Sequence, residues 1–277
     1  MQMRKRSFFT AAFAAFFAVA TFGQAPPSEQ ITVPLSAPDQ PGTLIVNHGR
    51  GNIAVIGYEG AVVIIKAAPA EPSGRGPDRN APGMKWIAAG EIRMSASEDR
   101  NVVTVVSNSA DKTIDLRILV PRKFNLKLSV KDNGGIEVDG VTGEMEINNI
   151  NGPVRLDHLA GSALVNTVDG DIFGRFDRLA PGLPLAFTSV YGKIDVAFPP
   201  DADLTVKMKT DRGSIFSDFD IAVDQRKSLS ESTEKPGGRR ISLEEWSSGK
   251  IGKGGTDVLL KSYEGNIYIR KSRAGRP

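Results

Sequence analysis

The sequence predicts an all-β, single-domain protein in which successive coils of the chain stack as a parallel β-helix, or β-solenoid. The main observation is a short phrase that recurs between residues 133 and 219: a turn that ends in glycine, then apolar residues at alternate positions. Copies include Asn151-Gly-Pro-Val-Arg-Leu156, Asp169-Gly-Asp-Ile172 and Tyr191-Gly-Lys-Ile-Asp-Val196. A fixed period of this kind is typical of stacked repeats, and its spacing predicts about 18 to 22 residues per coil.

The alternation of side chains explains why one copy of the phrase cannot fold by itself. Ile194, Val196 and Phe198 alternate with polar or small residues, so an extended strand directs the apolar set to one face. A second coil, stacked about 4.8 Å away, would bury that face and pair with the first through backbone hydrogen bonds. Half-periods of eight or nine residues also suit hairpins with glycine turns, so an antiparallel β-sandwich is the alternative.

The N-terminal residues 1–25 have the features of a signal peptide. Three basic residues, Arg4, Lys5 and Arg6, precede an apolar stretch at 8–22, which is shorter than the roughly 20 residues that a membrane span needs. We therefore expect export to the periplasm, the cell surface or the extracellular space, with an uncleaved anchor as the alternative. The chain has no cysteine, which excludes disulfides and thiolate metal sites.

The remaining residues, 26–277, are expected to form one β-solenoid domain with two inserts. Residues 67–90 are rich in proline and glycine and predict a long excursion from the coils. Residues 222–240 are polar and charged and predict an inserted surface loop. Strand-like runs precede the repeat block at 42–46, 52–56, 61–66, 91–94, 101–106, 113–120 and 124–130.

The charge balance argues against nucleic acid as a partner. The chain carries 35 Lys and Arg against 32 Asp and Glu, but three of the bases lie within the first six residues. Without the predicted signal peptide the balance is 35 − 3 = 32 bases against 32 acids, because no acid precedes Glu29. No basic run with interleaved aromatic residues is present either.

Catalytic and metal-binding motifs are missing from the sequence. It contains no H-E-x-x-H, no G-x-S-x-G and no phosphate-binding glycine loop, so we expect no enzyme, no metal and no small-molecule cofactor. His48 and His158 are each expected to be ordinary turn or surface residues. Asp169 and Asp171 are the pair to consider for a polysaccharide-cleaving site, although aspartate beside glycine is more simply a turn former.

Exposed aromatic side chains are the weak candidates for ligand binding. Trp86 and Trp246 lie in or beside the two inserts, and tryptophan often anchors binding interfaces. The alternative is that these rings cover the core beneath the inserts. The tyrosines lie near turns or strand ends, at positions 58, 191, 263 and 268.

The order of these features resembles the DUF4097 family of bacterial envelope proteins, which are described as candidate adhesins. The resemblance extends over roughly residues 40 to 271. It implies a secreted or surface-exposed β-solenoid without established catalytic residues, so none is carried over; the two inserts depart from the family pattern. It rests on Leu119-Val-Pro121, on the turns at 133–136, 169–172, 191–194 and 212–215, and on Gly252-Lys-Gly-Gly255 with Glu264-Gly-Asn-Ile267.

Together these observations predict an exported, non-enzymatic protein of the cell envelope with a binding or adhesion role. Repeated polar positions on stacked coils would offer many weak contacts, whose avidity adds along the axis, to an envelope protein, a surface polymer or a glycan. One alternative is a module that senses envelope stress or antimicrobial peptides. Another is a polysaccharide-cleaving β-helix enzyme.

Overall fold

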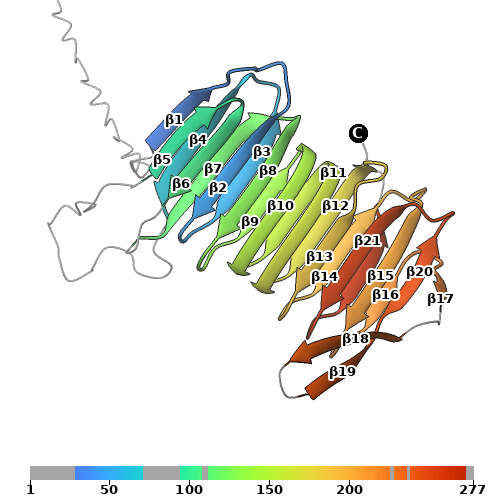
Figure 1. The fold of residues 1–277 in the computed structure, drawn as a ribbon. Coiled ribbons are helices and arrows are strands. Elements are labelled where there is room, and N and C mark those ends of the chain that lie inside the picture. Colours follow the sequence, from blue (N-terminus) through green and yellow to red (C-terminus); the bar gives the residue numbers. More distant parts are fainter. Residues whose placement is uncertain (1–28, 71–93, 108–111, 225–227, 236–237, 273–277) are drawn as a thin grey trace, which may run out of the picture.

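The computed structural model describes residues 29–70, 94–107, 112–224, 228–235 and 238–272, and its regular structure there consists of strands (Figure 1). Among these residues, no helix is long and apolar enough to cross a membrane. The predicted signal peptide at 1–25, the part of the first insert beyond residue 70, and Trp86 lie outside the described residues.

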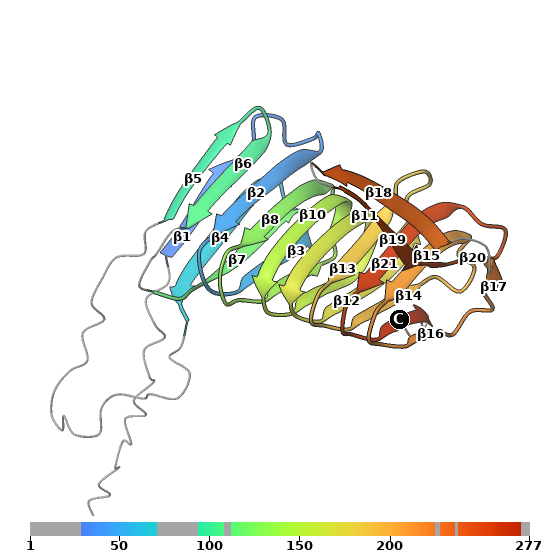
Figure 2. The ribbon, with the colours of Figure 1, turned by 60° about the horizontal axis from the view of Figure 1, so that its bottom comes forward.

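The strands line up in two facing walls that enclose one core (Figures 1 and 2). Wall 1 runs along the axis through β6 (Val102–Ser107), β2 (Gly42–His48), β8 (Phe124–Val130), β10 (Thr142–Asn151), β11 (Val154–Asp169), β13 (Leu185–Ser189), β21 (Thr256–Ser262) and β15 (Leu204–Thr210). Wall 2 runs through β7 (Ile114–Pro121), β3 (Ile53–Tyr58), β9 (Ile136–Asp139), β11, β12 (Ile172–Leu179), β14 (Ile194–Phe198), β22 (Ile267–Lys271) and β16 (Ile215–Ser217).

Neighbouring strands within each of these two series are parallel, which confirms the predicted β-solenoid and contradicts the antiparallel sandwich. Each coil supplies one strand to each wall. The long strand β11 serves both walls, because its first residues pair with β9 and its later residues pair with β10 and β13.

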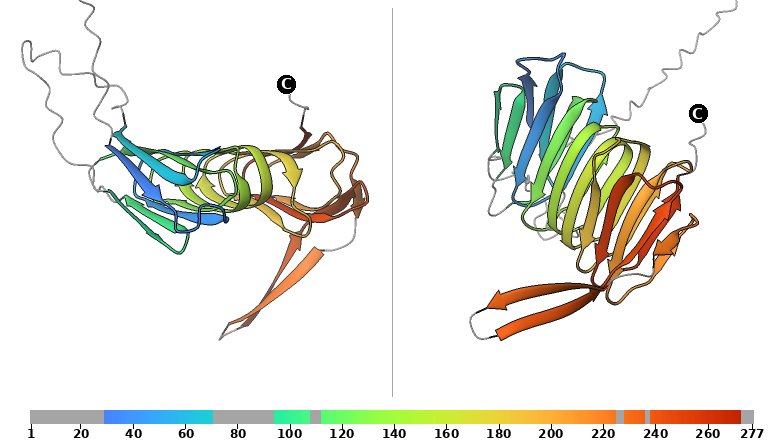
Figure 3. Two further views of the ribbon diagram at one scale, coloured as in Figure 1. Left: turned by 90° about the horizontal axis from the view of Figure 1, so that it is seen from above. Right: turned by 45° about the vertical axis from the view of Figure 1, so that its right-hand side comes forward.

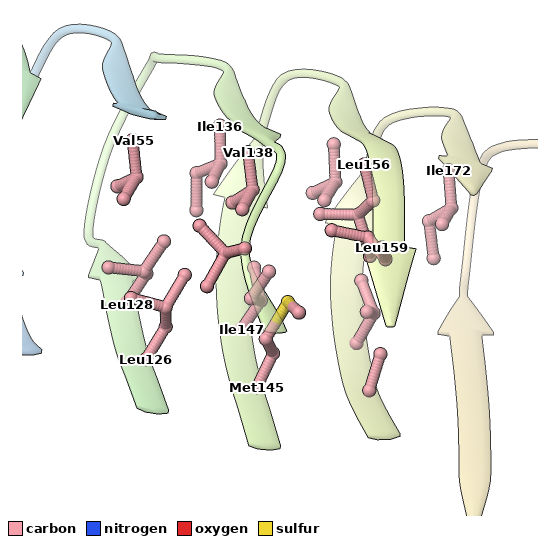
Figure 4. Close-up of a cluster of buried hydrophobic side chains, with 14 of the residues drawn as sticks. Val55, Leu126, Leu128, Ile136, Val138, Met145, Ile147, Leu156, Leu159 and Ile172 are labelled. Atoms are coloured by element: carbon pink, nitrogen blue, oxygen red, sulfur yellow. The ribbon is translucent and has the colours of Figure 1, made fainter. Parts of the chain in front are cut away.

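The core consists of the alternate side chains that point between the walls. Ile194, Val196 and Phe198 of β14 are completely buried, as the alternation predicted. Ile194 lies in register with Ile172 and Ile267 on the two neighbouring strands, so like residues stack on one another from coil to coil. Figure 4 shows the same arrangement nearer the middle, where side chains of wall 1 face those of wall 2: Leu126, Leu128, Met145 and Ile147 against Ile136, Val138 and Leu156.

The coils do not stack in the order of the chain. The coil β21–β22 lies between β13–β14 and β15–β16, and the coil β2–β3 lies between β6–β7 and β8–β9. The turn at Gly213 is the next one after Gly192 in the sequence, but the coil of Gly265 lies between them. The recurring phrases are so similar that the coils could stack in either order, so the repeat pattern alone could not predict which order the protein adopts.

Antiparallel strands close both ends of the solenoid. At one end β4 (Val62–Pro69) pairs with β7, β1 (Glu29–Pro34) pairs with β4, and β5 (Met94–Asp99) pairs with β6. At the other end β20 (Ser247–Ile251) pairs with β15, and the short β17 (Ala222–Asp224) pairs with β20. Side chains of Ile31, Met94 and Ala96 cover the first end of the core, and Phe219 and Ile221 belong to the second.

The two predicted inserts have different boundaries from those expected. Residues 67–69 belong to β4, where Ala67 is buried in the core. The segment 222–240, expected as a loop, instead contributes β17 and most of an antiparallel pair, β18 (Ser228–Lys235) and β19 (Gly238–Glu245), which projects from the walls (Figure 3). Ser228 pairs with Glu245 and Lys235 pairs with Gly238, so most of the polar residues expected to form a loop are in paired strands.

His48 is a buried core residue, which corrects its expected place at a turn or on the surface. Only 1% of it is exposed, and its Nε2 lies 2.8 Å from the carbonyl oxygen of Ile114. Its Nδ1 has no hydrogen-bond partner among the described residues. Burial lowers the pKa of His48, because a charged imidazolium would lose its hydration there.

This burial predicts a stability that falls in mild acid. In the unfolded chain His48 takes up its proton near pH 6.5, whereas the folded protein resists that proton, so stability is complete above pH 6.5 and is lost as the pH falls below it. Urea unfolding of the wild type and of His48→Val should therefore diverge between pH 7.5 and 5. Valine suits the site because Val130 occupies the same register position on β8. The wild type should lose up to about 1.4 kcal/mol more per pH unit than the variant, and parallel profiles would contradict this account.

Candidate functional site

A column of stacked glycines runs along the edge where wall 1 turns into wall 2. A Cβ atom built on Gly170 would lie 2.0 Å from the carbonyl oxygen of Gly152, and one built on Gly192 would lie 2.0 Å from that of Gly170. No side chain fits at that distance, so the recurring glycine is required by the close approach of adjacent coils. Along the axis the column comprises Gly51, Gly134, Gly152, Gly170, Gly192, Gly265 and Gly213.

Polar side chains that are buried or half-buried support this column from inside. They are the last inward residues of the wall 1 strands, and they lie in one row across the wall. Asn149 Nδ2 donates to the carbonyl oxygens of Gly134 and Gly152 at 3.0 and 2.8 Å. Three hydroxyls likewise donate hydrogen bonds to carbonyl oxygens of column glycines. They are Ser189 to Gly170 at 3.0 Å, Ser262 to Gly192 at 3.0 Å and Thr210 to Gly265 at 2.9 Å. The turns are thereby fixed in place.

Outside the column lies an open groove of about 790 Å³, here called the turn groove. Its floor is formed by glycines, so no side chains project from the floor into the groove. The residue after each column glycine forms the wall 2 side, and there the side chains are missing or small at Gly135 and Pro153. The residue before each column glycine forms the wall 1 side of the turn groove: Asn133, Asn151, Asp169 and Tyr191.

Ion pairs lie beyond both ends of the turn groove. On the side of Gly51, Arg50 binds Asp132, and this hydrogen bond lowers the pKa of Asp132. On the side of Gly213, the Arg212 Nη1 atom lies 2.6 Å from Glu264 Oε1. Both arginines are therefore paired with carboxylates. The residues that line the turn groove between them are uncharged or acidic, and the neighbouring Lys193 is paired with Asp171.

The structure brings Asp169 and Asp171 together on the turn groove, but their surroundings differ. Asp171 Oδ1 accepts a hydrogen bond from the backbone N–H of Lys193 at 3.0 Å, and its Oδ2 lies 3.6 Å from the Lys193 ammonium. Asp171 thus holds the neighbouring coil in place. Asp169 is exposed, lines the turn groove and forms no ion pair within the part of the chain that the structure describes.

Tyr191 is the aromatic residue of the turn groove, and the sequence did not single it out above the tryptophans. Its exposed fraction is 55%, the highest among the large hydrophobic side chains of the described residues. The exposed side chains of Ile150 and Val168 lie one residue before Asn151 and Asp169, so an apolar strip borders the polar one. The available signal was position: Tyr191 stands directly before a column glycine, where the three preceding coils that line the turn groove carry Asn or Asp.

Trp246 lies away from the turn groove, between β19 and β20. Three ammonium groups surround its ring, with Lys207, Lys261 and Lys209 Nζ at 4.5, 5.7 and 6.0 Å from the centroid. The lysines come from the outer face of β15 and β21 in wall 1. Trp246 therefore packs on that face through cation–π contacts.

A second, smaller hollow of about 320 Å³ lies on the outer face of wall 2, where β11 changes walls. His158 adopts a left-handed backbone conformation there, with φ of 52°. Its Nδ1 lies 2.9 Å from Asp139 Oδ1, its Nε2 lies 3.2 Å from Arg175, and Arg175 also pairs with Asp157. These hydrogen bonds and ion pairs link three adjacent coils, so the four side chains stabilise the stacking of the coils. No cluster of three potential metal ligands occurs among the described residues.

Comparison with known proteins agrees with this architecture. The model of the DUF4097 family, with the description Toastrack, matches residues 84–270 of the chain. The chain belongs to the DUF4097 family. No curated protein matches this DUF4097 chain. Among solved structures it is similar to a "putative cell adhesion protein" from Clostridium sporogenes, with 13% identity and a TM-score of 0.50, over 90% of this chain and 100% of the other. At that identity the likeness concerns the fold alone.

Proposed function

We propose that this DUF4097 protein is an exported, non-enzymatic binding protein of the cell envelope that holds an extended ligand along the turn groove. The observation that carries the proposal is the repetition of one polar position on four adjacent coils, at Asn133, Asn151, Asp169 and Tyr191. Coils in a solenoid are spaced by about 4.8 Å, so these side chains offer a regular series of contacts. Several weak contacts to one linear ligand add up to a useful affinity.

Export is part of the proposal because of the composition of residues 1–25, with three bases before an apolar stretch. Binding without catalysis is supported by the carboxylates of the turn groove. Asp171 is committed to Lys193 of the next coil, which leaves Asp169 without a second free carboxylate beside it. Acid–base cleavage of a glycosidic bond ordinarily requires two carboxylates in separate roles.

The experiment measures binding of the labelled domain, residues 26–277, to washed envelope fractions of the producing cell. Pro153→Trp fills the turn groove, because Pro153 is an exposed residue on its small-residue side. Pro34→Trp is the matched control, since Pro34 is an exposed proline at the edge strand β1. We expect Pro153→Trp to weaken binding at least about tenfold, or 1.4 kcal/mol, while the control binds as the wild type does. Equal binding by all three proteins would refute the turn groove as the binding site.

A further inference from the structure

We infer that the turn groove takes an uncharged polysaccharide. The inference rests on the proposed function and names the chemical class of its ligand. Three features of the turn groove point to this class: its charge, its hydrogen-bonding groups and its single exposed ring.

Charge disfavours an anionic polymer. The two carboxylates that line the turn groove are Asp169 and Asp171, and the neighbouring cation, Lys193, is paired with Asp171. The arginines beyond the two ends are each paired with an acid. A phosphate-rich or uronic chain would therefore meet like charge, and no cation among the described residues that line the turn groove would offset its desolvation.

The hydrogen-bonding groups match hydroxyls. The amides of Asn133 and Asn151 each supply donors and acceptors, and the Asp169 carboxylate supplies acceptors only. A sugar hydroxyl donates one hydrogen bond and accepts others, so it can satisfy both kinds of group. Since these side chains lie on successive coils at the same position, they suit a linear chain that presents hydroxyls repeatedly along its length.

The exposed ring of Tyr191 supplies an apolar surface at one end of the series. A pyranose ring has an apolar C–H face as well as hydroxyl edges, and an exposed aromatic ring can bury such a face at small entropic cost. Tyr263, on the next coil, differs because Arg212 already lies 5.2 Å over its ring. Tyr191 has no such partner among the described ring contacts, so its faces remain available.

The test uses affinity electrophoresis of the domain in gels that contain dextran, mannan or galactomannan as uncharged polymers. Alginate and polyphosphate serve as anionic polymers, and binding to polylysine is measured separately for the cationic class. We expect retardation by at least one uncharged polymer and by neither anion. Tyr191→Ala should reduce affinity at least about tenfold, and Tyr191→Phe should keep most of it. Phe216→Ala is the control, because Phe216 has a similar exposed fraction, 49%, on wall 2.

The outcomes separate this inference from the proposal beneath it. Binding to alginate, polyphosphate or polylysine alone would overturn the ligand class, yet sensitivity of envelope binding to Pro153→Trp would still support the turn groove as the site. Binding to none of the polymers would also overturn the inference. Equal loss in Tyr191→Ala and Phe216→Ala would show a general effect on the surface and would remove Tyr191 from the site.

Discussion

Gly170→Ala is expected to disrupt the solenoid, although it adds a single methyl group. The new Cβ would lie 2.0 Å from the carbonyl oxygen of Gly152 and 2.6 Å from its carbonyl carbon. Both are backbone atoms, so no side-chain rotation can relieve the clash, and the two coils must move apart. Separation weakens the backbone hydrogen bonds and the stacked core together. We expect the free energy of unfolding to fall by about 3 kcal/mol or more in urea titrations followed by circular dichroism.

Gly182→Ala is the control for this prediction. Gly182 has a left-handed φ of 76°, but no atom lies within 4 Å of the position of its added Cβ. Alanine there costs only the backbone penalty of about 1 kcal/mol. If Gly170→Ala proved no more harmful than Gly182→Ala, the close stacking of the glycine column would not be what makes glycine necessary.

Ile194→Asp is expected to abolish folding of the central coils. Ile194 is completely buried between Ile172 and Ile267, so the new carboxylate would have only apolar neighbours in its row. The loss of the apolar side chain and the burial of an unpaired charge together cost about 4 kcal/mol or more. Such a loss approaches the whole stability of many domains. The expected result is a loss of the β-sheet signal and a rise in protease sensitivity.

Ala197→Asp is the matched control, because it introduces the same charge on the same strand. Ala197 points away from the core, as the alternating burial of β14 shows. We expect this variant to stay within about 0.5 kcal/mol of the wild type. Similar destabilisation by both changes would mean that β14 does not separate a buried face from a wet one.

Much of the fold could be predicted from the sequence, because one period-2 pattern determines which side chains are buried. Ile172, Ile194 and Ile267 each follow a turn glycine by two residues, and all three are buried in the core. The order of the coils could not be predicted in the same way. A coil that stacks on the turn at Gly192 needs only a glycine and an apolar residue at the matching positions. The turns at Gly213 and Gly265 both provide them.

The turn groove was harder to predict than the core, because it arises from side chains that are small or missing. Asp169 and Asp171 were recognised as turn carboxylates, but the hollow beside them depends on Gly135 and Pro153 from other coils. The buried position of His48 could not be predicted either, because a histidine near a turn is ordinarily expected at the surface. Its strand alternates as expected, and the inward position near the turn accepts polar residues because carbonyl oxygens of the turns need donors.

The exchanged order of the coils determines when this protein can fold. A solenoid that stacks in chain order can add each coil as it leaves the ribosome or the export channel. Here β13 pairs with β21, so Leu185 must wait for Val258, and Ile194 must wait for Ile267. Until the last coil arrives, its two neighbours keep unpaired backbone edges and uncovered apolar rows. Contacts so distant along the chain slow folding, and they make completion of the C-terminal half a late, single event that follows synthesis of nearly the whole chain.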